Sequence, residues 1–443
     1  MLNYIWLGLI LVAVVLGGWN GRLQELTDGA FNGAKMAVLD IALPLVGITA
    51  LWLGMMRLAE QAGLVRTIAG WLRRPLRLLF PEVPSDHPAM GSMLMNMAAN
   101  MIGLTNAATP LGLRAMHDLE RLNPHPGTAT NAMCTFLALN TSSLQILPMT
   151  AIGIMAAKGG TQPTAIVGTA LLATACSTAA GITAVKLLER LPRFRVPIPA
   201  ARPASPGSST SPSPDDAPSA TAADPPAARR LGWGGKLALT AFAALVLMGF
   251  VHLLRQPAAD GEVAGGFVRA VNALSLLALP AFLSFFPLYA ALKGVPVYEE
   301  FVEGAREGFQ VAVRIIPFLV AMLVAIMMFR EAGGVALLTR ALEPLLGRVG
   351  FPTELLPMAL TRPLSGSATI GLFTDLVNTL GPDHLVTRMG GTLLGSTETT
   401  LYVVAVYFGA VGVRRARHAV AAGLLADLVG IIASVVVCRL MWG

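Results

Sequence analysis

The stretch Gly-Ser-Thr-Glu-Thr-Thr-Leu at residues 395–401 is a short polar segment inside a long apolar run. Its carboxylate, Glu398, is the only charged side chain between Arg388 and Arg414. An ionisable residue at membrane depth is energetically costly, and where one occurs it usually marks a functional site. The first half of the chain contains a similar stretch, Leu-Asn-Thr-Ser-Ser-Leu at residues 139–144. Two polar segments at matching places in two halves are typical of an internally repeated transporter.

The amino-acid composition is that of a membrane protein. Of 443 residues, 54% are hydrophobic and 13% are charged, whereas about 25% of the residues of a soluble globular protein are charged. Several uncharged apolar runs approach the ~20 residues that span a bilayer. The sequence therefore predicts an all-α integral membrane protein that contacts the lipid bilayer.

The distribution of charged residues, cysteines and histidines excludes several other classes of function. The net charge of +7 does not indicate nucleic-acid binding, because the basic residues cluster at the ends of apolar runs, where they fix orientation. The three cysteines show no CxxC spacing and the six histidines form no ligand pair, so we expect neither disulfides nor a metal site. Nucleotide-binding and hydrolase motifs are also missing from the sequence. We therefore predict no catalytic residue, no cofactor and no enzymatic activity.

Residues 191–230 are rich in Pro, Ser and Ala and contain too few large apolar residues to build a core. They are predicted to form a disordered linker between an N-terminal half, residues 1–190, and a C-terminal half, residues 231–443. The first apolar run, residues 2–17, is expected to be a retained membrane span rather than a cleaved signal peptide, because no clear cleavage pattern accompanies it.

Two segments are too polar to be lipid-facing helices. Residues 89–113 carry several Asn and Thr residues, and residues 355–380 carry an Arg together with several Ser and Thr residues. Irregular backbone at membrane depth is tolerated where it is buried in protein or lines a water-filled cavity. Both segments are therefore predicted to be re-entrant hairpins, and about ten transmembrane helices complete the predicted fold.

The relative orientation of the two halves depends on these hairpins. If both turn back, five membrane crossings separate the starts of the two repeats, and the repeats are inverted. If both cross the membrane, the basic loops 57–77 and 186–236 fall on opposite faces. The positive-inside rule favours the inverted arrangement, with the N-terminus and the linker in the cytoplasm.

The polar segments also carry a family resemblance. Residues 96–112 with 139–144 resemble spore maturation protein A, and residues 361–371 with 395–401 resemble spore maturation protein B, as if the two proteins were fused. Both carry the nucleoside-recognition or Gate domain. The resemblance implies a bacterial inner-membrane protein with an architecture similar to concentrative nucleoside transporters, in which inverted repeats contain paired re-entrant hairpins and partly unwound helices.

In inverted repeats, the hairpins and polar segments of both halves would meet at the midplane, where the exposed backbone of broken helices can bind a solute. The predicted substrate-binding residues of the first half are Asn96, Asn100, Asn106, Asn140, Thr141, Ser142, Ser143 and Gln145. Those of the second half are Thr361, Arg362, Ser365, Ser367, Thr369, Ser396, Thr397, Glu398, Thr399 and Thr400. The alternative is that these polar side chains only tie helices together.

Charged residues in the apolar spans are the predicted coupling groups. As a buried carboxylate, Glu398 could load and release a proton during transport, or it could be a structural partner of Arg362. Asp40 and Arg314 occupy similar places in the two halves. They are predicted either to pair with each other or to extend separately to an interface.

The favoured function is secondary transport of a small polar solute, nucleoside-like or a small anionic metabolite, by alternating access. H+ and Na+ are the candidate coupling ions. The alternative is a non-transporting membrane scaffold or regulator of envelope or spore maturation. A homo-oligomer is compatible with both functions.

Overall fold

The computed structural model describes residues 2–103, 105–143, 145–194, 231–255, 266–334 and 350–443, together with 337 and 340. Helices account for nearly all regular structure in these ranges, and they contain no named strand. The predicted linker, residues 191–230, lies outside the described residues from residue 195 onward. Its first residues end in the short turn η3 (Pro192–Phe194), whose Phe194 carbonyl accepts a hydrogen bond from Arg417 Nε at 2.9 Å.

The first half contains two long helices, a helical hairpin and an interrupted helix. In chain order its elements are α1 (Leu2–Trp19), α2 (Leu23–Lys35), the π-helical segment η1 (Met36–Ala42), α3 (Leu43–Gln61), α4 (Leu64–Leu79), α5 (Pro88–Ile102), α6 (Thr105–Glu120), α7 (Asn131–Thr141), α8 (Met149–Ala157), η2 (Pro163–Ala165) and α9 (Ile166–Leu188).

The second half adds a peripheral helix pair and then repeats the order of long helix, hairpin, interrupted helix and long helix. Its elements are α10 (Trp233–Arg255), α11 (Gly266–Leu292), α12 (Val297–Glu331), η4 (Thr353–Leu355), α14 (Leu356–Thr361), α15 (Gly366–Leu380), α16 (Leu385–Ser396), α17 (Thr400–Ala410) and α18 (Ala419–Trp442).

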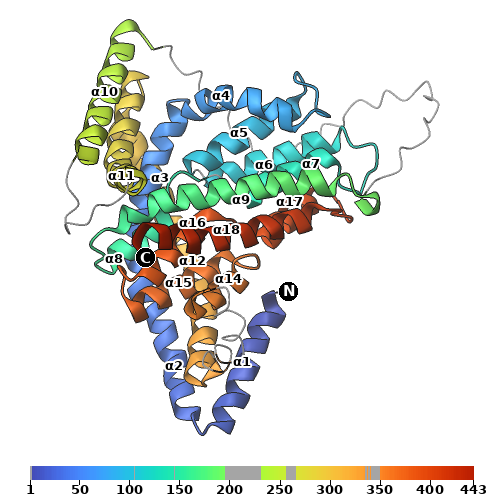
Figure 1. Ribbon diagram of the computed structural model, residues 1–443, viewed down its shortest axis with the longest axis vertical. Coiled ribbons are helices and arrows are strands. Elements are labelled where there is room, and N and C mark those ends of the chain that lie inside the picture. Colours follow the sequence, from blue (N-terminus) through green and yellow to red (C-terminus); the bar gives the residue numbers. More distant parts are fainter. Residues whose placement is uncertain are drawn as a thin grey trace.

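Equivalent long helices of the two halves pack against each other: α3 against α12, and α9 against α18 (Figure 1). Glycine permits the close approach of α3 and α12, because a Cβ added at Gly308 would lie 2.6 Å from the Ala50 Cα. At one end of this contact, Arg57 forms ion pairs of 2.7 Å with both Glu300 and Glu307. The two halves therefore share one core rather than forming two separate bundles.

The segment predicted as the first hairpin does reverse direction. Pro88 occupies the first turn of α5, and the helix ends at Gly103, whose φ of 88° favours glycine. After this turn, α6 packs along α5. The second predicted hairpin is also interrupted: α14 ends at Thr361, and α15 begins after Ser365, whose side chain caps the Ala368 amide at 3.2 Å.

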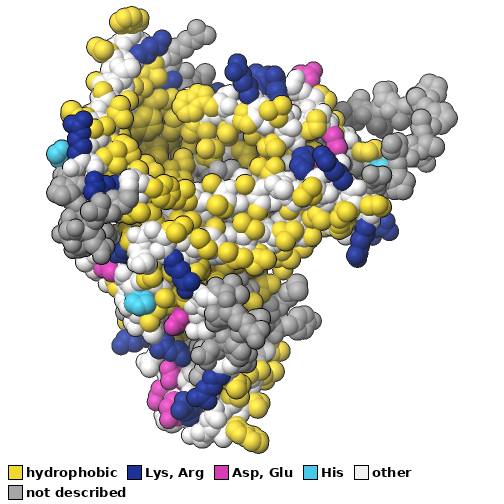
Figure 2. Space-filling model, viewed as in Figure 1, with side chains coloured by type: hydrophobic (Ala, Val, Ile, Leu, Met, Phe, Trp, Pro, Cys, Tyr) yellow, Lys and Arg dark blue, Asp and Glu magenta, His cyan; other side chains and the backbone are white. Residues whose placement is uncertain are grey.

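Four described helices are long and apolar enough to cross a membrane: Pro163–Leu188, Trp233–Arg255, Gly266–Leu292 and Ala419–Trp442. The interrupted helices are short, and α3 and α12 contain side chains outside the described part of the structure, so the total number of spans stays a prediction. Figure 2 shows hydrophobic side chains across much of one face, with Lys and Arg gathered toward its edges. These features are those of a multi-pass helical membrane protein.

Candidate functional site

The predicted polar segment of the first half interrupts a helix. Thr141 Oγ1 and Ser142 Oγ bond to carbonyls three residues earlier, at 3.0 and 3.1 Å, and helix geometry resumes after Pro148. Hydroxyl side chains that compete for backbone partners in this way favour a helix end. Ser143 adopts a φ of 42°, which is unusual for a residue other than glycine.

Side chains of the neighbouring helix α9 form hydrogen bonds with the residues of this break. Thr174 Oγ1 lies 2.8 and 2.6 Å from the carbonyl oxygens of Ser142 and Ser143 and can donate to either. Thr178 Oγ1 donates to Ser142 Oγ at 3.1 Å. Carbonyl groups released by the break are thereby satisfied within the protein, as a membrane interior requires.

The polar segment of the second half interrupts another helix, between α16 and α17. Residues 397–399 have no helical structure, and the peptide N–H of Glu398 donates to the Thr141 carbonyl at 2.8 Å. This single backbone bond joins the breaks of two chain segments that are more than 250 residues apart. We call the region where the two breaks meet, residues 140–143 and 396–400, the crossing.

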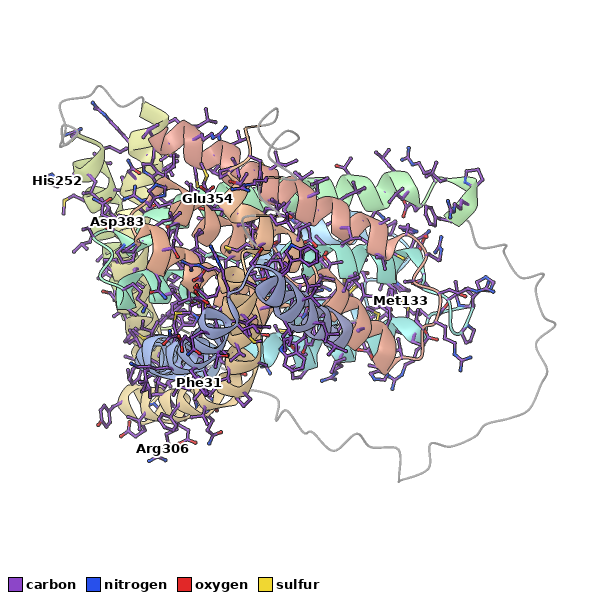
Figure 3. All side chains as sticks on the ribbon, turned by 90° about the horizontal axis from the view of Figure 1, so that it is seen from below. Phe31, Met133, His252, Arg306, Glu354 and Asp383 are labelled. Carbon is purple, nitrogen blue, oxygen red and sulfur yellow. The ribbon has the colours of Figure 1, made fainter. Side chains whose placement is uncertain are left out.

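The two interrupted helices run in opposite directions through the crossing. Figure 3 shows Met133, near the start of α7, and Asp383, just before α16, at opposite ends of the bundle. Correspondingly, α7 packs against α17 and α8 packs against α16 (Figure 1). The crossing therefore contains the C-terminal ends of α7 and α16 and the N-terminal end of α17, and α8 begins beside it at Met149. The partial charges of these helix ends can bind groups of either sign.

The first hairpin contributes a cluster of amide side chains to the crossing. Asn100 Nδ2 donates to Asn140 Oδ1 at 2.9 Å, and Asn96 Nδ2 donates to the Ala108 carbonyl at 2.7 Å. Tyr407 of α17 donates its hydroxyl to Asn140 Oδ1 at 3.4 Å and stacks on Phe136 at a centroid distance of 6.0 Å. Tyr407 was not among the predicted site residues, because its aromatic ring fits an apolar helix pattern.

The second hairpin contributes a buried cation. Arg362, 5% exposed, donates through Nη2 to the carbonyl oxygens of Leu394, at 3.1 Å, and Thr397, and through Nε to Thr397 Oγ1 at 3.3 Å. These carbonyls form the C-terminal, electronegative end of α16, which favours a positive charge. Arg362 and Glu398 form no ion pair among the described contacts, so the predicted Arg362–Glu398 pair is not observed in this conformation.

The second hairpin touches the crossing at Gly366, where an added Cβ would lie 3.0 Å from Thr399 Oγ1, and its other predicted residues are engaged locally. Thr361 Oγ1 donates to the Pro357 carbonyl at 2.6 Å, and Thr369 Oγ1 donates to the Ser365 carbonyl at 2.7 Å. Ser365 and Ser367 hydroxyls lie 3.3 Å apart at the tip of the second hairpin.

The remaining predicted residues differ in burial. Ser396, Thr397 and Thr400 are 0% exposed, and Thr399 is 4% exposed. Glu398 is half-buried, and its side chain has no hydrogen bond among the described contacts.

The structure brings Gln145 to the first hairpin, since a Cβ at Gly103 would lie 3.3 Å from Gln145 Nε2. Three predicted residues have side chains outside the described part of the structure: Asn106, Asp40 and Arg314. Asn106 lies on α6 of the first hairpin, Asp40 in η1 and Arg314 on α12. The element η1 packs against α12, but the predicted pairing of Asp40 with Arg314 stays a prediction.

The fold and the crossing define a multi-pass helical membrane protein in which two broken helices meet beside two helical hairpins. The Gate family, described as nucleoside recognition, matches residues 42–158 and 312–414, which include both breaks and both hairpins. Spore maturation protein B of Bacillus subtilis (strain 168) is 46% identical over 176 residues, which are 40% of this chain and 99% of that protein. Spore maturation protein A of the same organism is 43% identical over 177 residues, which are 40% of this chain and 90% of that protein.

The chain therefore belongs to the spore maturation protein A and B family and contains the Gate nucleoside-recognition domain in two segments. Two relatives that each match about 40% of the chain are consistent with a fusion of two such proteins. The crystal structure of the Alcanivorax borkumensis YdaH transporter aligns with a TM-score of 0.41 at 15% identity, over 99% of this chain and 97% of that one. Similarity at this level does not establish a shared fold.

Proposed function

We propose that this protein is a secondary transporter of a small polar solute in the bacterial inner membrane, and that the crossing is its solute site. The observation that carries the proposal is the bond from the Glu398 amide to the Thr141 carbonyl, because it places two helix breaks in contact. Broken helices at the centre of a membrane bundle present backbone groups and helix ends to a solute. A protein with a purely structural role has no need of two such breaks at one place.

The proposed arrangement in the membrane is a pair of inverted repeats. The opposite directions of α7 and α16 and the repeated order of elements support it. In this arrangement each half approaches the crossing from a different side, and a rigid-body movement of one half against the other exposes the site alternately. The N-terminus and residues 191–230 are placed in the cytoplasm.

The solute class follows from the groups that face the crossing. Carboxamides, hydroxyls and helix N-terminal amides offer hydrogen bonds in both directions, which suits a nucleoside-like molecule. The N-terminal ends of α8 and α17 and the charge of Arg362 also suit a small anionic metabolite. The description of the matching domain, nucleoside recognition, supports the first of these classes.

A ligand-binding screen tests the proposal. Thermal unfolding of the purified protein is measured with nucleosides, nucleobases and pyridine dicarboxylates, since a ligand that binds the native state raises the unfolding temperature. We expect one class to stabilise the protein. Ser142→Leu and Thr399→Leu should abolish this shift, because each fills the crossing with an apolar side chain.

The matched control is Thr240→Leu, since Thr240 lies on the peripheral helix α10 and its hydroxyl donates to the Leu237 carbonyl of the same helix, at 2.8 Å and exposed. A solute shift that persisted in both crossing variants would contradict the proposed site.

A membrane scaffold for envelope or spore maturation is the second candidate, and the names of the two relatives support it. This candidate predicts that no small solute stabilises the protein. It also predicts that the Ser142→Leu variant complements a deletion strain as fully as the wild type does. We expect no enzymatic role under either candidate.

A further inference from the structure

A second buried charge lies beside the crossing. Asp427, near the middle of α18, is 1% exposed. Its Oδ2 accepts a hydrogen bond from Thr400 Oγ1 at 2.6 Å, whereas its Oδ1, equally buried, has no hydrogen-bond partner in the described residues. A carboxylate buried without full pairing is costly, so its presence calls for a ligand or a proton.

Glycine brings hydroxyl groups close to this carboxylate. Gly423 and Gly430 lie one turn on either side of Asp427 on the same face of α18. A Cβ at Gly423 would lie 2.7 Å from Thr400 Cγ2, 3.3 Å from Thr400 Oγ1 and 3.4 Å from Thr141 Oγ1. Both threonine side chains therefore lie against α18 one turn before Asp427, and Thr400 also bonds to the carboxylate.

Each of these hydroxyl groups already donates its proton in a hydrogen bond. Thr141 Oγ1 donates to the Ala138 carbonyl at 3.0 Å, and Thr400 Oγ1 donates to Asp427 itself. A hydroxyl that donates its proton elsewhere retains lone pairs on oxygen. The cluster of Asp427, Thr141 and Thr400 thus offers oxygen acceptors and no spare donor, which is the character of a cation site.

The charged groups around Asp427 leave it without a dedicated counter-ion. Arg362 and Glu398 are the charged groups that interact electrostatically with Asp427. Arg362 donates to the carbonyls at the end of α16, and it forms no ion pair with Asp427 among the described contacts. The groups that α9 and α16 present to this face of α18 are neutral hydroxyls, Ser177 and Ser396, which bond to the Ala426 carbonyl and to Ser434 respectively.

We propose that Asp427, with the hydroxyl oxygens of Thr141 and Thr400, binds a small monovalent cation, either a proton or Na+. Thr141 ends α7, Thr400 begins α17 and Asp427 belongs to α18, so the cation links both breaks to a third helix. Cation binding would couple solute movement to the cation gradient, and this coupling rests on the transport function proposed above. Binding of the cation itself does not depend on that function.

The experiment uses the purified full-length protein in lipid nanodiscs without any solute. Thermal unfolding is recorded as NaCl replaces N-methyl-glucamine chloride at constant ionic strength, and again across a pH series without Na+. A Na+-dependent rise in unfolding temperature identifies a Na+ site. Without a Na+ effect, a pH-dependent component that Asp427→Asn lacks identifies a proton site. Asp427→Asn should lose whichever response the wild type shows. Asp375→Asn, which alters a carboxylate of α15 that pairs with Arg330 at 2.7 Å, should retain it.

A second pair of variants keeps the test decisive if Asp427→Asn fails to fold. If the site binds Na+, Thr400→Val should weaken the apparent Na+ affinity about 10–100-fold, as loss of a supporting group typically does at ion sites. If it binds a proton, Thr400→Val should instead strengthen proton binding, because the Thr400 hydroxyl donates to the carboxylate and stabilises its ionised form. Thr400→Ser should restore the wild-type response in either case. The proposal is overturned if Asp427→Asn responds like the wild type, if the wild type responds to neither cation, or if Glu398→Gln alone loses the response. Solute-induced stabilisation, measured separately, reports on the transport proposal whichever of these results is obtained.

Discussion

Replacement of Arg362 by Met tests whether a buried cation holds the crossing together. Arg362 donates to two backbone carbonyls, those of Leu394 and Thr397, and its charge reaches Asp427 and Glu398. Met has a similar length but neither charge nor donors. The substitution therefore leaves two carbonyls without their donor and two carboxylates without a nearby positive charge.

The expected loss of stability can be worked from these contacts. A buried polar group without a partner costs about 1–3 kcal/mol, and Arg362 is the donor to two such carbonyls. We therefore expect a loss of about 2–6 kcal/mol in the free energy of unfolding. Arg330→Met is the matched control: Arg330 pairs with Asp375 at 2.7 Å, but its side chain is 38% exposed. Pairs of this kind contribute about 1 kcal/mol or less.

The assay is reversible unfolding of the purified protein in mixed micelles by increasing mole fraction of SDS, followed by circular dichroism. The double variant Arg362→Met/Asp427→Asn completes the measurement, because removal of both charges should cost less than the sum of the single changes if they interact. Equal losses for Arg362→Met and Arg330→Met, or strict additivity in the double variant, would refute the role assigned to Arg362.

Three further predictions follow from packing, ionisation and orientation. Gly308→Ala should destabilise the protein by about 1–3 kcal/mol, because its Cβ would meet the α3 backbone. The control Gly47→Ala, whose Cβ would have nothing within 4 Å, should be neutral or slightly stabilising. SDS unfolding of the two variants measures the difference. Although burial opposes it, the Thr161 amide, at 2.9 Å, and Arg388 lower the pKa of Asp383. Asp383→Asn should therefore lose stability at neutral pH, and the difference from wild type should shrink as the pH falls below the ordinary value of 3.8; constancy down to pH 2 would contradict this. If residues 195–230 are cytoplasmic, a fluorescent protein inserted there should fluoresce, and alkaline phosphatase inserted there should be inactive.

Local sequence patterns predicted a large part of the architecture. Apolar runs predicted a helical membrane protein, and the polar stretches at 139–144 and 395–401 coincide with the two helix breaks. Hydroxyl and glycine residues within an apolar run interrupt helices by their own backbone preferences, so these features can be recognised without knowledge of the fold. The same patterns predicted both hairpins, and the family resemblance was confirmed by the relatives.

Tertiary structure decided which of these elements meet. The bond between the Glu398 amide and the Thr141 carbonyl, and the position of Tyr407 against Asn140, join segments more than 250 residues apart. The sequence suggested Glu398 as a partner for Arg362, but the guanidinium instead lies on the carbonyl end of α16. Helix periodicity and composition are local properties of a chain, whereas the partner of a buried charge is set by the packing of distant helices, which only the folded arrangement contains.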